Sequence, residues 1–83
     1  MWLTEFMHLK KPQQVELLYN KAVYIGKLIE RHSINVLYQL DGFYVEVFYL
    51  KYRWKIGYIN AFESIDLLDP YLKFMDVEEL IND

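Results

Sequence analysis

The dipeptide Asp41-Gly42 constrains the fold more than any other feature of the sequence. It separates two runs of residues in which every second side chain is apolar or tyrosine. The runs are INVLYQL before the dipeptide and FYVEVFYL after it. Asp-Gly is typical of a two-residue hairpin turn, in which both central residues take positive φ. The sequence therefore predicts an antiparallel hairpin whose ladder starts at the pair Leu40–Phe43 and runs to the pair Ile34–Tyr49.

This register gives the hairpin two faces of different composition. One face, here called the apolar face, carries Ile34, Val36, Tyr38, Leu40, Phe43, Val45, Val47 and Tyr49. The opposite face, here called the mixed face, carries Asn35, Leu37, Gln39, Tyr44, Glu46 and Phe48. Because both strands place their apolar residues on the same side, the apolar face is expected to face the core.

Two further segments have the period of two that is typical of strands. They are KLIER at 27–31 and WKIGYINAF at 54–62, and we expect Trp54, Ile56 and Tyr58 on the apolar face. The turn between the first two strands falls at 32–33, and the loop before the last falls at 50–53. Together with the hairpin, these segments predict a four-stranded antiparallel meander.

Helical spacing precedes the strands. In residues 12–25, Val15, Leu18, Ala22 and Ile25 recur every three or four positions after a proline at the first turn. Gly26 is expected to end this helix by taking a left-handed conformation. Ahead of it, Trp2, Leu3, Phe6 and Leu9 are consistent with a short helical turn capped by Thr4.

The segment after the last strand predicts short helices with polar caps. Ser64 can cap the IDLL turn, and Asp69 followed by Pro70 begins the PYLKFM helix. Asp76 and Glu79 form a pair similar to a capping box before VEELI. The expected fold is therefore a single α+β domain over residues 1–83, with an N-terminal helix, the meander and short C-terminal helices.

Composition limits the class of protein. The 83 residues are 54% hydrophobic and 18% aromatic, which is globular composition in a chain small enough for a second copy to add stability. There is no cysteine, so disulfides and thiolate metal sites are excluded, which fits a reducing compartment. The first residues lack the features of a signal peptide, and no apolar run approaches about 18 residues. We expect a cytoplasmic protein with no membrane association.

Charge is distributed unevenly along the chain. Residues 1–62 hold eight basic and five acidic side chains, whereas residues 63–83 hold one basic and seven acidic ones. This asymmetry is consistent with self-association, with an acidic tail that masks a basic surface, or with ordinary solvated helix faces. The helix caps account for much of the acidic segment.

No pattern in the sequence predicts catalysis. The histidines are His8 and His32, and neither belongs to a nucleophile, zinc-binding or phosphate-binding motif. Glu63, Asp66 and Asp69 recur every three residues, but capping explains them better than a metal site does. We expect a protein that is not an enzyme and that uses no metal or cofactor.

Two binding functions remain. Sheets that bind nucleic acid stack bases on exposed rings beside basic groups, and Lys51, Tyr52, Arg53 and Lys55 could form such a site. The pI of about 5.3 and the position of Glu46 within the mixed face argue against it. This site is therefore kept as the alternative.

The preferred expectation is a protein-binding or self-associating module, acting as a homodimer or with another protein. Its interface would lie on the mixed face and comprise Leu37, Tyr44, Phe48, Leu50 and Ile59. If all helices pack on the apolar face, this surface stays open. If one helix packs on each face, the result is a closed monomer, and the sequence does not decide between these arrangements.

The runs INVLYQLDGFYVEVFY and SIDLLDPYLKFMDVEELI resemble a group of short uncharacterised bacterial proteins with a helix, a YVEV-type meander and a Leu-Asp-x-Tyr-Leu ending. The resemblance covers residues from about 15 to the end, and its motifs are turns, strands and caps. It implies the same α+β fold and attaches no activity to it.

Overall fold

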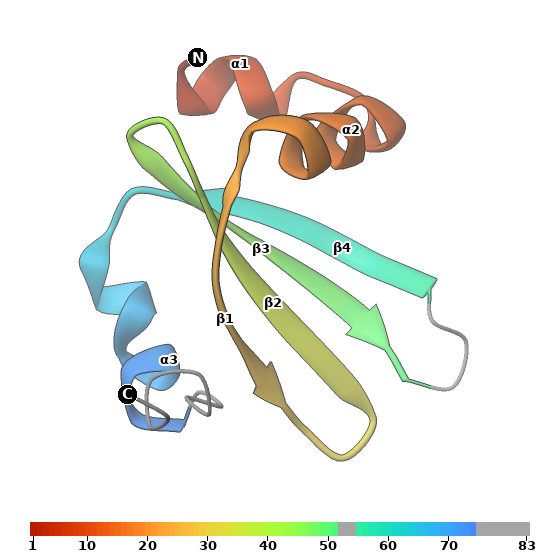
Figure 1. Cartoon of the computed structure of the whole chain (residues 1–83), viewed down its shortest axis with the longest axis vertical. Coiled ribbons are helices and arrows are strands. Elements are labelled where there is room, and N and C mark those ends of the chain that lie inside the picture. Colours follow the sequence, from red (N-terminus) through yellow and green to blue (C-terminus); the bar gives the residue numbers. More distant parts are fainter. Residues whose placement is uncertain (52–54, 75–83) are drawn as a thin grey trace.

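The computed structural model describes residues 1–51 and 55–74, and Figure 1 shows an antiparallel sheet with helices at both ends of the chain. In chain order the elements are α1 (Leu3–Met7), α2 (Lys11–Lys21), β1 (Val23–Ile29), β2 (Ser33–Leu40), β3 (Phe43–Leu50), β4 (Lys55–Phe62), the 3₁₀ helix η1 (Ile65–Leu68) and α3 (Asp69–Phe74). The strands lie in the order β1-β2-β3-β4, so the α+β class and the meander are confirmed. None of the helices in these two ranges is long and apolar enough to cross a bilayer.

The central hairpin has the register that the Asp-Gly turn predicts. Leu40 pairs with Phe43, Ile34 pairs with Tyr49, and every pair between them is as expected. The turn differs in one respect, because only Asp41 has positive φ, at 52°, and Gly42 does not. Aspartate tolerates the left-handed region better than most residues do.

The first predicted helix is too long by a turn. It ends at Lys21, and Val23–Ile29 form β1, so the strand starts four residues before the expected position. The helical spacing of Ala22 and Ile25 was misleading, because VYI is a β-branched and aromatic run that favours a strand. Gly26 is a buried strand residue next to a register shift and does not cap a helix.

A β-bulge at Gly57 changes the faces of β4. Tyr58 pairs with Phe48 and Ile56 pairs with Tyr49, which leaves Gly57 unpaired on β4. Ile56 therefore lies on the apolar face as predicted, but the prediction for Tyr58 is wrong, since it lies on the mixed face. Ile59 in turn lies on the apolar face. Trp54 lies outside the described residues.

The apolar face and the N-terminal helices form the larger part of the core. Phe6 of α1 and Leu18 of α2 pack on strand residues that are at most 3% exposed, namely Leu40, Phe43, Val45 and Val47. The rings of Phe6 and Phe43 lie 5.7 Å apart at 55°. Buried Gln14 donates a hydrogen bond from Nε2 to the carbonyl oxygen of Phe6 at 2.9 Å, which joins α2 to α1.

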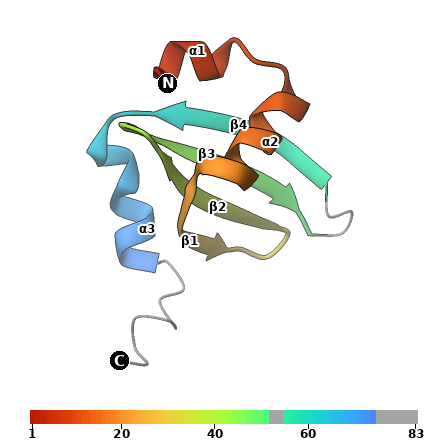
Figure 2. The ribbon, with the colours of Figure 1, turned by 45° about the horizontal axis from the view of Figure 1, so that its top comes forward.

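The mixed face carries a second, smaller cluster under α3. Tyr71 of α3 is 2% exposed and packs with Leu28, Leu37 and Phe62. Its hydroxyl donates a 2.6 Å hydrogen bond to Glu46 of β3. Helices thus pack on both faces, as Figure 2 shows, so the arrangement with all helices on the apolar face is excluded for the described part of the chain.

The predicted caps have mixed outcomes. Ser64 Oγ accepts a hydrogen bond from the amide of Asp66 at 3.3 Å, which confirms Ser64 as the cap of η1. Thr4 lies inside α1, whose first turn is stabilised by the Glu5 carboxylate accepting from the Trp2 amide at 2.7 Å. Asp69 is the first residue of α3. Asp76 and Glu79 lie outside the described residues.

Candidate functional site

The N-terminal helices cover only one half of the apolar face. With 11 residues, α2 is about 16 Å long, whereas an eight-residue strand spans about 26 Å. Figure 1 shows α1 and α2 over the end of the sheet nearest the β2–β3 turn. The other half, here called the open half, carries Ile29, Ile34, Val36, Tyr38, Tyr49 and Ile56.

A cavity lies where α2 meets the open half. Its volume is about 180 Å³, and we call it the tyrosine pocket. Its lining comprises Val15, Leu18, Tyr19, Tyr38, Val47, Tyr49 and Ile56. The side chains of Leu18 and Val47 are buried and belong to the main core cluster, so the pocket borders the core.

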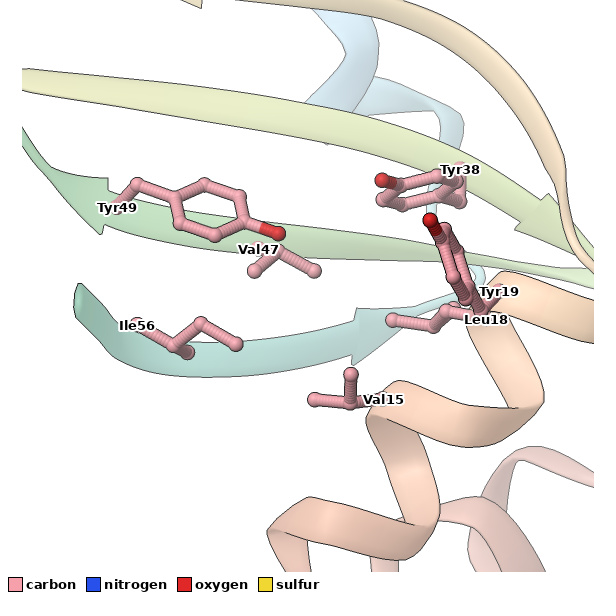
Figure 3. Close-up of a pocket in the computed structure, with 7 residues that line it drawn as sticks. All are labelled: Val15, Leu18, Tyr19, Tyr38, Val47, Tyr49 and Ile56. Atoms are coloured by element: carbon pink, nitrogen blue, oxygen red, sulfur yellow. The ribbon is translucent and has the colours of Figure 1, made fainter. Parts of the chain in front are cut away.

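Three tyrosines supply the polar atoms of this pocket. Figure 3 shows the hydroxyl ends of Tyr38 and Tyr49 pointing toward one another across the sheet, with Tyr19 of α2 beside Tyr38. Burial is the main cause that raises the pKa of Tyr38 above its usual 10.0, and the neighbouring Tyr49 and a hydrogen bond with it contribute. The ring of Tyr24 packs edge-on against Tyr38 at 6.2 Å.

The chemistry of the pocket is that of recognition. Its lining combines aliphatic groups with phenolic hydroxyls, which both accept and donate hydrogen bonds. Tyr19 is 92% exposed, although it lies at the rim of an apolar cavity. Exposed tyrosine beside an apolar pocket is a combination enriched in binding interfaces.

One basic group lies within the open half. Lys27 of β1 pairs with Val36, so its side chain belongs to the apolar face between Ile29 and Tyr24. It is half-buried, which is typical of a lysine whose methylene groups lie on apolar surface while the ammonium reaches water. This places a positive charge beside an otherwise uncharged surface.

The interface predicted on the mixed face is not a continuous surface. Leu37 is 1% exposed under Tyr71, and Ile59 lies on the other side of the sheet because of the bulge. Tyr44 stacks on Phe62 at 5.8 Å, and Phe48 stacks on Tyr58 at 4.8 Å, while Leu50 is half-buried. The five residues therefore divide between a buried cluster, two ring pairs and the apolar face.

The alternative nucleic-acid site is only partly described. Lys51 follows β3 and Lys55 begins β4, so these two basic residues lie next to one another at the end of the sheet. Leu50 pairs with Lys55, directly beside Lys51. Tyr52 and Arg53 lie outside the described residues.

No grouping of acidic and histidine side chains in residues 1–51 and 55–74 could hold a metal ion. Glu63, Asp66 and Asp69 are exposed. The backbone amide of Asp66 donates a hydrogen bond to the Ser64 hydroxyl.

No protein-family model, curated protein or solved structure matches this chain. The resemblance to short bacterial proteins stays a prediction.

The tyrosine pocket was not predicted from the sequence. Tyr38 and Tyr49 were assigned to the apolar face correctly, but that face was taken to be wholly core. The signal that could have indicated an opening is the length of the predicted helix, since its 14 residues span about 21 Å and an eight-residue strand spans about 26 Å. Tyr19, four residues after Val15, also adds a large exposed ring to the edge of the apolar stripe of α2.

Proposed function

We propose that the chain is a small protein-binding module and that the tyrosine pocket receives an apolar side chain of its partner. The observation that supports this most strongly is the pocket itself, an apolar cavity with tyrosine hydroxyls that borders the open half, over which the described part of the chain places no helix. At about 180 Å³ it is smaller than the roughly 300–1,000 Å³ of sites for drug-sized ligands. It is better suited to a single anchoring side chain, around which a partner spreads over flatter surface.

The charge of the open half specifies the partner further. Lys27 is the charged residue that the four described strands place on the apolar face. A partner segment that carries a carboxylate next to its anchor would pair with this ammonium group. We therefore expect a segment with an aromatic or branched aliphatic anchor and an adjacent Asp or Glu.

A panel of fluorescent synthetic peptides tests this function. Each peptide carries Trp, Phe, Leu, Ser or Lys at one anchor position, with Glu or Lys beside it, and anisotropy gives the dissociation constant. We expect the acidic peptides with apolar anchors to bind with micromolar constants, and those with Ser or Lys anchors to bind at least tenfold more weakly. Equal binding by all peptides, or none at millimolar concentration, would contradict the proposal.

Two α2 variants supply the matched control. Val15→Phe puts a ring into the tyrosine pocket, whereas Glu16→Phe puts the same ring on the exposed side of the helix one residue later. We expect Val15→Phe to weaken peptide binding at least tenfold and Glu16→Phe to leave it within about twofold. Lys27→Glu should weaken binding of the Glu-bearing peptides and strengthen binding of the Lys-bearing ones.

The same assay tests the nucleic-acid alternative with a labelled single-stranded oligonucleotide. Binding that falls steeply with salt and is lost on changing Lys51 and Lys55 to Glu would favour the alternative.

A further inference from the structure

The two edge strands of the sheet differ in how well they could accept another strand. Neither β1 nor β4 has a further neighbouring strand in the described ranges. The ladder of β1 is interrupted in its middle at Ile25, and α3 packs beside it. The bulge of β4 lies near its start, at Gly57, so Tyr58–Phe62 form five regular residues without a charge.

Charge makes β4 complementary to a second copy of itself. Lys51 and Lys55 lie at its beginning, and Glu63 and Asp66 follow its end. An antiparallel pairing of two copies brings the basic end of each next to the acidic end of the other. A parallel pairing would bring like charges together and is disfavoured.

We propose that the protein forms a two-fold symmetric dimer through β4, with Asn60 of each copy opposite Asn60 of the other, in one eight-stranded sheet. This register places Tyr58 opposite Phe62 of the second copy and Ile59 opposite its Ala61. The uncharged residues of the two edges then coincide, and all unpaired backbone groups along this stretch gain partners.

The rings of the mixed face support this register. Within one copy Phe48 stacks on Tyr58 at 4.8 Å and 6°, and Tyr44 stacks on Phe62 at 5.8 Å and 26°. Pairing Tyr58 with Phe62 of the second copy places these two stacks side by side across the interface, although Phe62 is already only 7% exposed in the single copy. Tyr58 is 46% exposed in the single copy, so it has surface left to bury.

The dimer is independent of the tyrosine pocket, which lies on the apolar face near the other end of β4. Each copy keeps its open half, so the dimer would present two binding sites. Its interface is one pair of strands and is smaller than the standard interface of about 1,600 Å². We therefore expect a dimer that dissociates on dilution.

Sedimentation velocity over a dilution series tests the dimer with charge variants at its centre. Asn60→Lys places two ammonium groups opposite one another across the two-fold axis of the dimer, which should weaken the dimer. Within one copy the same ammonium group lies opposite the Glu46 carboxylate, which favours the fold. We expect the wild type to shift from dimer to monomer on dilution and Asn60→Lys to raise the dissociation constant at least tenfold. The control Asn20→Lys adds the same charge on exposed α2 and should leave the constant unchanged.

A charge swap separates a lost interface from a lost fold. Asn60→Glu should also be monomeric, and its carboxylate lies opposite Glu46 within one copy, which should lower the stability of the fold slightly. An equimolar mixture of the two Asn60 variants, each shown to be folded by circular dichroism, should form heterodimers. A wild type that is monomeric at high concentration would overturn the proposal. So would an Asn60→Lys variant that dimerises as the wild type does, or a mixture of folded variants that stays monomeric.

A cysteine variant tests the register directly, because the chain contains no cysteine. Asn60→Cys should form a disulfide-linked dimer with oxidised glutathione, since directly opposed residues of antiparallel strands lie within disulfide reach. Asn20→Cys should cross-link much more slowly. Equal rates for the two variants would overturn the assigned register.

Discussion

Replacement of Gly57 by alanine should destabilise the protein, because the bulge brings the backbone of β4 against a ring. A Cβ at Gly57 would lie 2.6 Å from Cδ1 and 3.1 Å from Cε1 of Phe48. Carbon atoms in ordinary contact lie about 3.5–4.0 Å apart, so the ring has to move by about 1 Å. The ring is held in its stack on Tyr58, which such a shift would disturb.

The expected cost of Gly57→Ala follows from these contacts. Overpacking costs about 1–3 kcal/mol, and a disturbed ring pair accounts for about 0.5–1.5 kcal/mol of that. For a chain of this size, whose urea slope is about 1 kcal/mol per molar, the denaturation midpoint should fall by about 1–3 M. Gly42→Ala is the matched control, because a Cβ there meets nothing within 4 Å and the φ of Gly42 is not positive. It should be neutral or stabilising by about 0.4–1 kcal/mol.

Urea unfolding followed by circular dichroism measures both variants. The assignment to Phe48 is tested in a Phe48→Ala background, where Gly57→Ala should cost less than about 0.5 kcal/mol because the clashing ring is absent. A Gly57→Ala variant as stable as Gly42→Ala, or one whose cost is the same with and without Phe48, would refute the bulge geometry.

Two further predictions concern the clusters on the two faces of the sheet. Phe6→Ala should lower the free energy of unfolding by about 3–5 kcal/mol, because Phe6 is 0% exposed and joins α1 to the sheet; a urea midpoint close to that of the wild type would contradict the packing of α1. Tyr71→Phe should cost about 1.5–3 kcal/mol at pH 7, since it removes the hydrogen bond to Glu46, and the difference from the wild type should shrink above pH 10. Burial, together with that hydrogen bond, raises the pKa of Tyr71 above its usual 10.0, so at high pH the tyrosine ionises in the unfolded chain and not in the folded one. Above pH 10 the free energy of unfolding of the wild type should therefore fall more steeply than that of Tyr71→Phe, by about 1.4 kcal/mol per pH unit. Parallel pH profiles of the two proteins would contradict the buried position of Tyr71.

The sequence predicted the centre of the sheet well because a short turn determines it. Asp41-Gly42 joins two strands with two residues, so the side-chain period of two then assigns every residue of the hairpin to a face. The assignment holds even though Gly42 does not take the positive φ that was expected.

Prediction of the strands from the sequence failed at two places. In one a strand contains an extra residue, and in the other a helical spacing of apolar residues continues into a strand. The bulge at Gly57 reverses the faces of all β4 residues after it, and alternation alone gives no sign of such an insertion. At the end of α2, Ala22 and Ile25 continue the helical spacing, but every residue of Val23–Ile29 except Ile25 pairs with β2. Tertiary pairing thus overrides the local helical pattern.

The candidate site depends on the length of α2 and on where α2 lies over the sheet. The alternation of apolar residues along a strand specifies neither. In the sequence, Tyr38 and Tyr49 occupy the same alternating positions as core residues such as Val45. They line a cavity and are not fully buried because α2 does not extend over them. The mixed face was predicted as the interface because its sequence is rich in rings and moderately apolar around Asn35, Gln39 and Glu46. It is instead partly covered by Tyr71, a residue whose burial was not foreseen.

The most direct test of the proposed binding surface is a ¹⁵N NMR titration with N-acetyltryptophanamide, which carries an aromatic side chain between two peptide groups. We expect saturable chemical-shift changes concentrated at the backbone amides of Tyr38, Val47, Tyr49 and Ile56, with a dissociation constant of about 1 mM for so small a probe. Val15→Phe should abolish these changes and Glu16→Phe should not. Shifts centred on Tyr58 and the mixed face, or equal shifts in both variants, would contradict the account.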